Sequence, residues 1–87
     1  MNIRPSITIY YRNGCGYCGA AEKYLRDILT DRPITLQLTP APPEMPGVPV
    51  IVGYKQGRQI AHAVGFNREA LDRLVAVLLT DYPQLTN

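Results

Sequence analysis

Residues 6–18 read SITIYYRNGCGYC, and the spacing of apolar side chains changes within this stretch. Ser6 to Tyr11 alternates between two faces, and its β-branched and aromatic content favours a strand. Arg12-Asn13-Gly14 ends that strand. From Gly16 onward the apolar residues recur at helical spacing, namely at Cys18, Ala21, Leu25, Ile28 and Leu29. The stretch therefore predicts a strand, a turn and a helix, with Cys15 at the helix N-terminus.

A second strand and a long loop follow. Residues 34–39 alternate strictly between apolar and polar, which is typical of an edge strand with one buried face. Residues 40–49 contain five prolines. Proline removes an amide donor and clashes with the preceding helical turn. A stiff loop rather than a helix is therefore expected here.

The last third of the chain predicts a hairpin and a helix. Residues 50–52 form a short apolar run typical of a buried strand, residues 55–58 supply a turn, and residues 59–64 return as the antiparallel partner. Asn67 is a suitable N-cap for a helix in which apolar residues recur until Pro83. The predicted order is β-α-β-loop-β-β-α, within a single domain of residues 1–87.

Composition and charge exclude several classes of protein. The chain has 87 residues, 46% of them hydrophobic and 18% charged, which describes one small globular domain. Nine basic and seven acidic residues are too evenly balanced for nucleic-acid binding. No apolar run approaches the ~20 residues of a membrane span, and the N-terminus lacks the continuous apolar region of a secretory signal. We expect a cytoplasmic protein that binds neither nucleic acid nor membrane.

The candidate catalytic motif is Cys15-Gly16-Tyr17-Cys18. Unpaired backbone amides and the helix dipole at a helix N-terminus favour a thiolate over a thiol. Cys15 would attack a disulfide, and Cys18, on the first helical turn, would resolve the mixed disulfide. The alternatives are a structural cysteine pair and half of a metal site. With no further cysteine and only His62 to add, a four-ligand zinc site of cysteine and histidine is unavailable within one chain, so no metal or bound cofactor is expected.

Three separate sequence motifs resemble those of one protein family. The stretch from Ile7 to Cys18, Val48-Pro49 before a strand, and Gly65-Phe66 before the last helix resemble glutaredoxins and the glutaredoxin-like hydrogen donors of ribonucleotide reductase. The resemblance spans nearly the whole chain. It implies a thioredoxin-like α/β fold with a four-stranded mixed sheet. It also implies an enzyme that reduces protein or glutathione mixed disulfides. Residues 40–47 depart from the family, because they stand where its members carry a middle helix, which is expected to be shortened or lost here.

The resemblance also implies a substrate groove beside the dithiol. Val48-Pro49 would be a cis peptide bond that faces the dithiol, with the Val48 backbone pairing with the substrate, and Tyr17 would form a groove wall. Arg12 would either stabilise the Cys15 thiolate or hold a glutathione carboxylate, unless it is merely an exposed residue at the strand end.

The groove would be completed by Gly65, Phe66 and Asn67. Asn67 stands where family members that bind glutathione well carry an acidic residue. It would either accept a hydrogen bond from glutathione or simply cap the helix.

The partners inferred from the resemblance are disulfide-containing proteins, with ribonucleotide reductase as one client. The electron source would be either glutathione, as a co-substrate, or a flavoprotein thioredoxin reductase. A monomer is expected.

Two functions from other classes remain open. One is a scaffold in which two chains share an iron–sulfur cluster through Cys15, with Gly16 leaving space beside the sulfur. The other is a catalytically idle interaction domain.

Overall fold

The computed structural model describes residues 4–80. Its elements follow the predicted order: β1 (Ser6–Tyr11), α1 (Gly16–Ile28), β2 (Thr35–Pro40), β3 (Val50–Lys55), β4 (Arg58–Val64) and α2 (Arg68–Leu79). The second strand begins and ends one residue later than predicted, and the third continues three residues beyond Val52. Pro83, the predicted limit of the last helix, lies outside the described residues.

The four strands form one mixed sheet in the order β2-β1-β3-β4. β1 runs parallel to β2 and antiparallel to β3, and β3 and β4 form an antiparallel hairpin. The predicted edge position of β2 is confirmed. Both central residues of the hairpin turn, Gln56 and Gly57, have positive φ, at 54° and 78°. This is the pattern of a two-residue type I′ turn, whose twist matches that of the strands.

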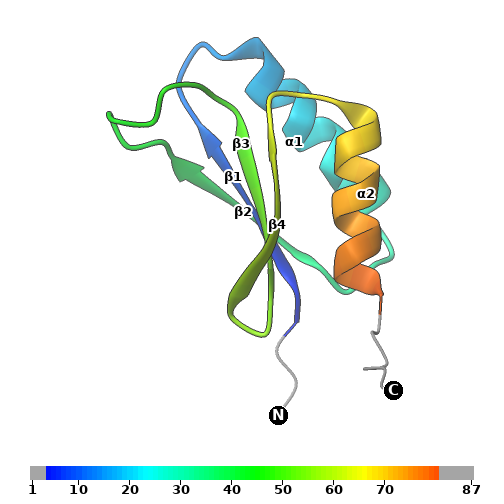
Figure 1. The fold of residues 1–87 in the computed structure, drawn as a ribbon. Coiled ribbons are helices and arrows are strands. Elements are labelled where there is room, and N and C mark those ends of the chain that lie inside the picture. Colours follow the sequence, from blue (N-terminus) through cyan, green and yellow to red (C-terminus); the bar gives the residue numbers. More distant parts are fainter. Residues whose placement is uncertain (1–3, 81–87) are drawn as a thin grey trace.

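Both helices cover the same face of the sheet (Figure 1). The apolar stripe predicted for α1 is buried there, and α2 packs beside it over β3 and β4. The core consists of residues from β1, β3 and the two helices and their flanks, namely Ile7, Ile9, Ala21, Leu25, Leu29, Ile34, Ile51, Leu71, Leu74, Val75 and Leu78. Within residues 4–80, neither helix has the length and apolar composition needed to cross a bilayer.

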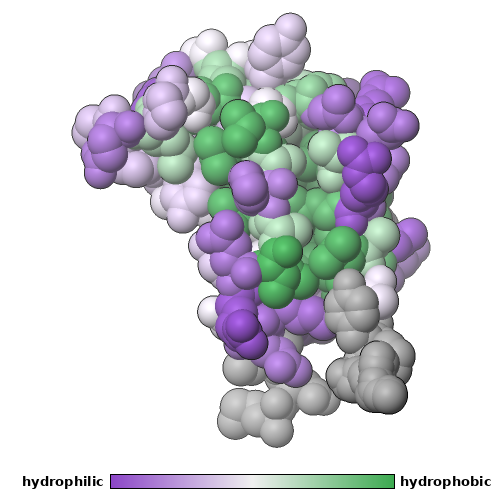
Figure 2. Space-filling view, in the orientation of Figure 1, coloured by the Kyte–Doolittle hydropathy of each residue, from purple (hydrophilic) through white to green (hydrophobic). Residues whose placement is uncertain are grey.

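β2 is less buried than its alternating sequence predicts. Leu36 is half-buried and Leu38 is 38% exposed. The reason is that α1 packs over β1, one strand further in, so the edge strand is only partly covered. β4 is also an edge strand, and it exposes Ile60 and Val64. Figure 2 shows hydrophobic side chains over β4 and between β4 and α2, bordered by hydrophilic side chains on the hairpin turn and on the outer side of α2.

The loop between β2 and β3 contains no helix, as predicted. Pro42 and Met45 of this loop line one groove of about 360 Å³ together with Tyr10, Val50 and Tyr54 of the sheet. These sheet residues lie on the face opposite the helices, because they alternate with Ile9 and Ile51 of the core. The loop therefore partly covers the sheet face that carries no helix.

Candidate active site

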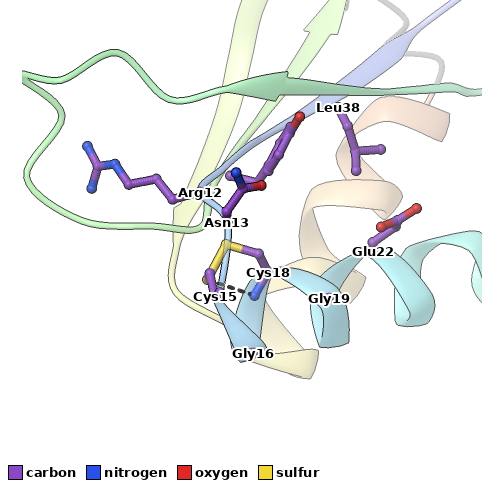
Figure 3. A pocket seen from close by; sticks show the side chains of 10 residues that line it. Arg12, Asn13, Cys15, Gly16, Cys18, Gly19, Glu22 and Leu38 are labelled. Atoms are coloured by element: carbon purple, nitrogen blue, oxygen red, sulfur yellow. Dashed lines mark hydrogen bonds between the residues drawn. A yellow bond between two sulfur atoms is a disulfide. The ribbon is translucent and has the colours of Figure 1, made fainter.

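Cys15 and Cys18 form a disulfide at the start of α1, with their Cα atoms 5.3 Å apart (Figure 3). Cys15 is the N-cap of the helix, and its Sγ accepts a hydrogen bond from the Cys18 backbone N–H at 3.1 Å. Cys18 is 6% exposed, whereas Cys15 is half-buried. Cys15 is therefore the more exposed residue of the two, and a backbone donor points at its sulfur.

Arg12 lies just before this helix and reaches into the loop between β2 and β3. Its Nη2 donates hydrogen bonds to the backbone carbonyls of Pro42, at 3.0 Å, and Met45. Figure 3 shows the guanidinium directed into the loop and away from the disulfide. Of the alternatives given for Arg12, the guanidinium does not lie beside the Cys15 sulfur in this structure, and contact with a glutathione carboxylate stays a prediction. Prolines in the loop have no N–H groups, so the loop has few backbone donors, and the guanidinium adds a donor to the Pro42 carbonyl, which also accepts from the Met45 N–H, and one to the Met45 carbonyl.

Val48–Pro49 is a cis peptide bond, as the resemblance implies. Pro49 is fully buried, and its carbonyl accepts a hydrogen bond from the Gly65 N–H at 2.8 Å. Gly65 has φ +81°, a conformation that favours glycine. This hydrogen bond joins Pro49 to Gly65, two of the residues expected to form the substrate groove. The chain segments that contain these two residues lie at the same end of the sheet as the start of α1 (Figure 1).

Phe66 and Asn67 have structural roles at the start of α2. Asn67 is the N-cap, and its side-chain oxygen accepts a hydrogen bond from the Ala70 N–H at 2.9 Å. Phe66 packs against the core and meets Tyr24 of α1 edge-on, with ring centroids 6.0 Å apart. Tyr17, the expected groove wall, is 70% exposed.

Tyr24 connects the two helices. Its hydroxyl donates a hydrogen bond to Asp72 Oδ1 at 2.6 Å. This bond, followed by burial and the negative charge of Asp72, raises the pKa of Tyr24 above 10.0. The guanidinium of Arg68 lies 5.6 Å from the centre of the Tyr24 ring, where it makes a cation–π contact.

The disulfide lies in a groove of about 590 Å³ that runs from the end of β1 across α1 to β2. Arg12, Asn13, Glu22 and Leu38 line it as well. Glu22 and Leu38 are not among the residues that the sequence predicts for the site. Glu22 lies four residues after Cys18, a spacing that places both on one helix face, so the sequence contains a signal for it. Leu38 has no such signal, because its position depends on the pairing of β2 with β1.

The other expected groove residues do not line this 590 Å³ groove, namely Tyr17, Val48, Pro49, Gly65, Phe66 and Asn67. Within residues 4–80, no group of three or more His, Cys, Asp or Glu side chains lies close enough together to hold a metal ion.

A scan against models of known protein families finds no match, and a search of curated proteins finds none either. Solved structures of thioredoxins do match. Thioredoxin O2 from Arabidopsis thaliana, in its oxidised state, superposes with a TM-score of 0.76 at 18% identity, covering 88% of this chain and 76% of that one. Oxidised mitochondrial thioredoxin 3 from Saccharomyces cerevisiae has a TM-score of 0.73 at 20% identity, covering 84% and 77%. A thioredoxin variant from Halobacterium salinarum has a TM-score of 0.75 at 19% identity, covering 91% and 78%.

This chain has the thioredoxin fold.

In this thioredoxin fold, three chain segments lie at the same end of the sheet (Figure 1). They are the start of α1 with Cys15 and Cys18, the cis Val48–Pro49 peptide, and the turn at Gly65. The fold prediction made from the sequence, including the four-stranded mixed sheet, is confirmed. At these identities the likeness establishes the fold, and the chemistry has to be argued from the site itself.

Proposed function

We propose that this protein is a thiol–disulfide oxidoreductase that works through Cys15 and Cys18. The observation that carries the proposal is the Cys15 sulfur at the N-cap of α1, disulfide-bonded to Cys18 and hydrogen-bonded to its N–H. A helix N-terminus stabilises negative charge, so in the reduced protein the same N–H and the helix dipole would stabilise a Cys15 thiolate.

The reaction consists of two thiol–disulfide exchanges. The Cys15 thiolate attacks one sulfur of the substrate disulfide, the substrate S–S bond breaks, and one half of the substrate leaves as a thiolate that takes a proton from water. The Cys18 thiolate, formed by loss of its proton to water, then attacks the Cys15 sulfur and releases the other half. The substrate gains two electrons, and the protein ends as the disulfide seen in the structure.

The exposure of the two cysteine residues supports this division of roles. Cys15 is half-buried and can meet a substrate, whereas Cys18 is only 6% exposed and sits where it can attack Cys15. We further propose that an extended substrate segment pairs with the Val48 backbone and lies against Tyr17 and Phe66. No cofactor is needed for this chemistry. A dithiol that must be reduced before it attacks suits a reducing compartment, for which the cytoplasm is the candidate.

Substitution of each cysteine tests the roles. Cys15→Ser should abolish reduction of a protein disulfide such as that of insulin, and full activity in this variant would refute the assignment. Cys18→Ser should retain the attack and accumulate a mixed disulfide with the substrate, detectable as an added mass. Failure to trap any adduct under oxidising conditions would count against the two-step route.

The rate of alkylation separates this proposal from an idle interaction domain. A free cysteine is only a few per cent thiolate at pH 7. If the helix N-terminus favours the thiolate, iodoacetamide should alkylate reduced Cys15 at least about fivefold faster than an ordinary exposed thiol at this pH. A rate equal to that of free cysteine would favour the idle domain.

The finer proposal is that the protein is a glutaredoxin-like donor, with ribonucleotide reductase as one client. Its electron source is tested by reduction of a glutathione mixed disulfide, driven by glutathione, glutathione reductase and NADPH. Rapid turnover would identify glutathione as the source. No turnover, from a folded protein whose thiols titrate as free, would indicate recharging by a flavoprotein thioredoxin reductase. We favour the second outcome, because Asn67 lacks the charge that would bind the glutathione amine strongly and is engaged as a helix cap.

A further inference from the structure

Glu22 is an acidic side chain beside the dithiol to which the proposed reaction assigns no role. It follows Cys18 by four residues on α1, so the two side chains lie one turn apart on one face of the helix. Glu22 lines the same 590 Å³ groove as both cysteines. Figure 3 shows its carboxylate raised from α1 toward Leu38 on β2. A molecule that reaches the sulfurs through this groove therefore passes a carboxylate.

The other charged residue that lines this groove is Arg12. Its guanidinium is engaged with the carbonyls of Pro42 and Met45 and points away from the disulfide (Figure 3). It is therefore poorly placed to offset the charge of Glu22 within the groove. Glu22 has a partner outside the groove lining, since its Oε2 accepts a hydrogen bond from Arg26 Nε at 2.9 Å. Arg26 offsets part of this charge, but the pair is open to solvent, with the side chains of Arg26 and Glu22 59% and 32% exposed, so a substrate cation can compete with Arg26 for the carboxylate.

We propose that Glu22 makes this groove select disulfides that carry a positive charge, an ammonium or guanidinium group, close to their sulfur atoms. The proposal rests on the proposed oxidoreductase function and names a substrate class for it. The exchange itself is unchanged: Cys15 bonds to one substrate sulfur, the other half leaves as a thiolate, and Cys18 displaces the retained half. The positive group of the substrate lies beside the Glu22 carboxylate while the Cys15–substrate bond forms.

The expected preference is modest, because the groove is open to water. One exposed carboxylate should change the relative rates of cationic and anionic disulfides by about threefold to tenfold. The net charge of the whole chain is +2 and acts in the opposite direction, so a preference for cations would have to come from a local group. Salt should weaken the preference, since the screening length falls from roughly 30 Å at 0.01 M to roughly 3 Å at 1 M salt.

Single-turnover oxidation of the reduced protein tests the proposal without any recycling partner. The full chain is reduced, freed of reductant and mixed at neutral pH with excess cystamine, hydroxyethyl disulfide or dithiodipropionate, which are cationic, neutral and anionic. The reaction is stopped with iodoacetamide, and mass spectrometry counts the remaining thiols. The readout is the ratio of the cystamine rate to the dithiodipropionate rate, each divided by the rate with the neutral disulfide.

Two variants and a control sharpen the measurement. Glu22→Gln keeps the size of the side chain and should lower the ratio by about threefold to tenfold, and Glu22→Lys should lower it further. Comparing the ratio between variants removes the intrinsic reactivity of each disulfide. Dividing by the rate with the neutral disulfide removes any general change in thiol reactivity. The control, Asp31→Asn, removes an exposed carboxylate beyond the far end of α1 and should leave the ratio unchanged.

The outcomes separate the two proposals. If the neutral disulfide fails to oxidise the reduced wild-type dithiol, the oxidoreductase proposal fails and the selectivity proposal fails with it. If the neutral disulfide reacts but the ratio is the same in wild type, Glu22→Gln and Glu22→Lys, the selectivity proposal alone is overturned. The selectivity proposal is supported if the ratio is lower in both Glu22 variants than in wild type, and if the wild-type ratio approaches that of Glu22→Gln at 1 M salt.

Discussion

Replacing Arg12 with methionine removes the hydrogen bonds that hold the loop between β2 and β3 to the end of β1. In the folded protein one guanidinium nitrogen donates to the carbonyls of Pro42 and Met45. A hydrogen bond from a charged donor contributes ~1.5–3 kcal/mol when buried, and the partial exposure of these bonds reduces that to about 1 kcal/mol each. Methionine keeps the apolar stem and removes both donors. We therefore expect Arg12→Met to lower the free energy of unfolding by about 2 kcal/mol.

The assay is urea unfolding of the disulfide form, followed by far-UV circular dichroism, so that cysteine chemistry does not contribute. For a domain of this size a loss of 2 kcal/mol corresponds to a fall in Tm of roughly 8–16 °C. Arg12→Lys should recover part of the loss, because an ammonium can reach one carbonyl but lacks the planar fork of a guanidinium. Arg32→Met is the matched control, because Arg32 lies in an exposed turn, and it should change stability by less than about 0.5 kcal/mol.

Hydrogen exchange provides a local readout of the same contact. The Met45 N–H donates to the Pro42 carbonyl at 3.0 Å, so this loop amide should lose protection in Arg12→Met while the amides of β1 keep theirs. Since the loop leads into Val48, with whose backbone we propose that the substrate segment pairs, reaction with protein disulfides should slow more than reaction with hydroxyethyl disulfide. A variant within about 0.5 kcal/mol of wild type, with an equally protected loop, would refute the argument.

Substitutions at three further positions test other contacts. The pKa of Tyr24 is raised mainly by its hydrogen bond to Asp72, so the folded protein holds this proton more tightly than the unfolded chain. The stability gained from this bond is fully present below pH 10 and is lost as the pH rises through the raised pKa of Tyr24 in the folded protein. Urea midpoints measured between about pH 9 and 11 should therefore fall less steeply in Tyr24→Phe than in wild type. Gly53→Ala should destabilise by about 1 kcal/mol, because the added Cβ would lie 3.2 Å from a methyl group of Leu74; a Tm at or above that of wild type would contradict this. Asn67→Ala should cost about 1 kcal/mol through loss of the helix cap, whereas Asn67→Ser should retain most of the stability, and equal losses in thermal unfolding would argue against capping.

Much of this fold is encoded locally. The alternation in β1, the helical spacing after Gly16 and the prolines of the following loop each depend on a few neighbouring residues, and each prediction agrees with the structure. The N-cap roles of Cys15 and Asn67 are also local, because a cap is formed by a side chain and an amide three residues later. Element bounds were less accurate, as for β3, where the three residues after Val52 remain in the strand through pairing with β4.

The sequence by itself therefore determined the order of elements, the helix caps and the place of the dithiol at a helix start. It did not determine what Arg12 contacts, how Gly65 meets Pro49, or that Glu22 and Leu38 share a groove with the cysteines. Arg12 lies 30 residues from Pro42 along the chain, and Leu38 reaches the groove only because β2 pairs with β1 in one register. Such contacts form only once the sheet has assembled, because strand order and register decide which distant side chains become neighbours. Periodicity and capping act within about one turn of a helix or one pair of strand residues, and for that reason they are visible in the sequence.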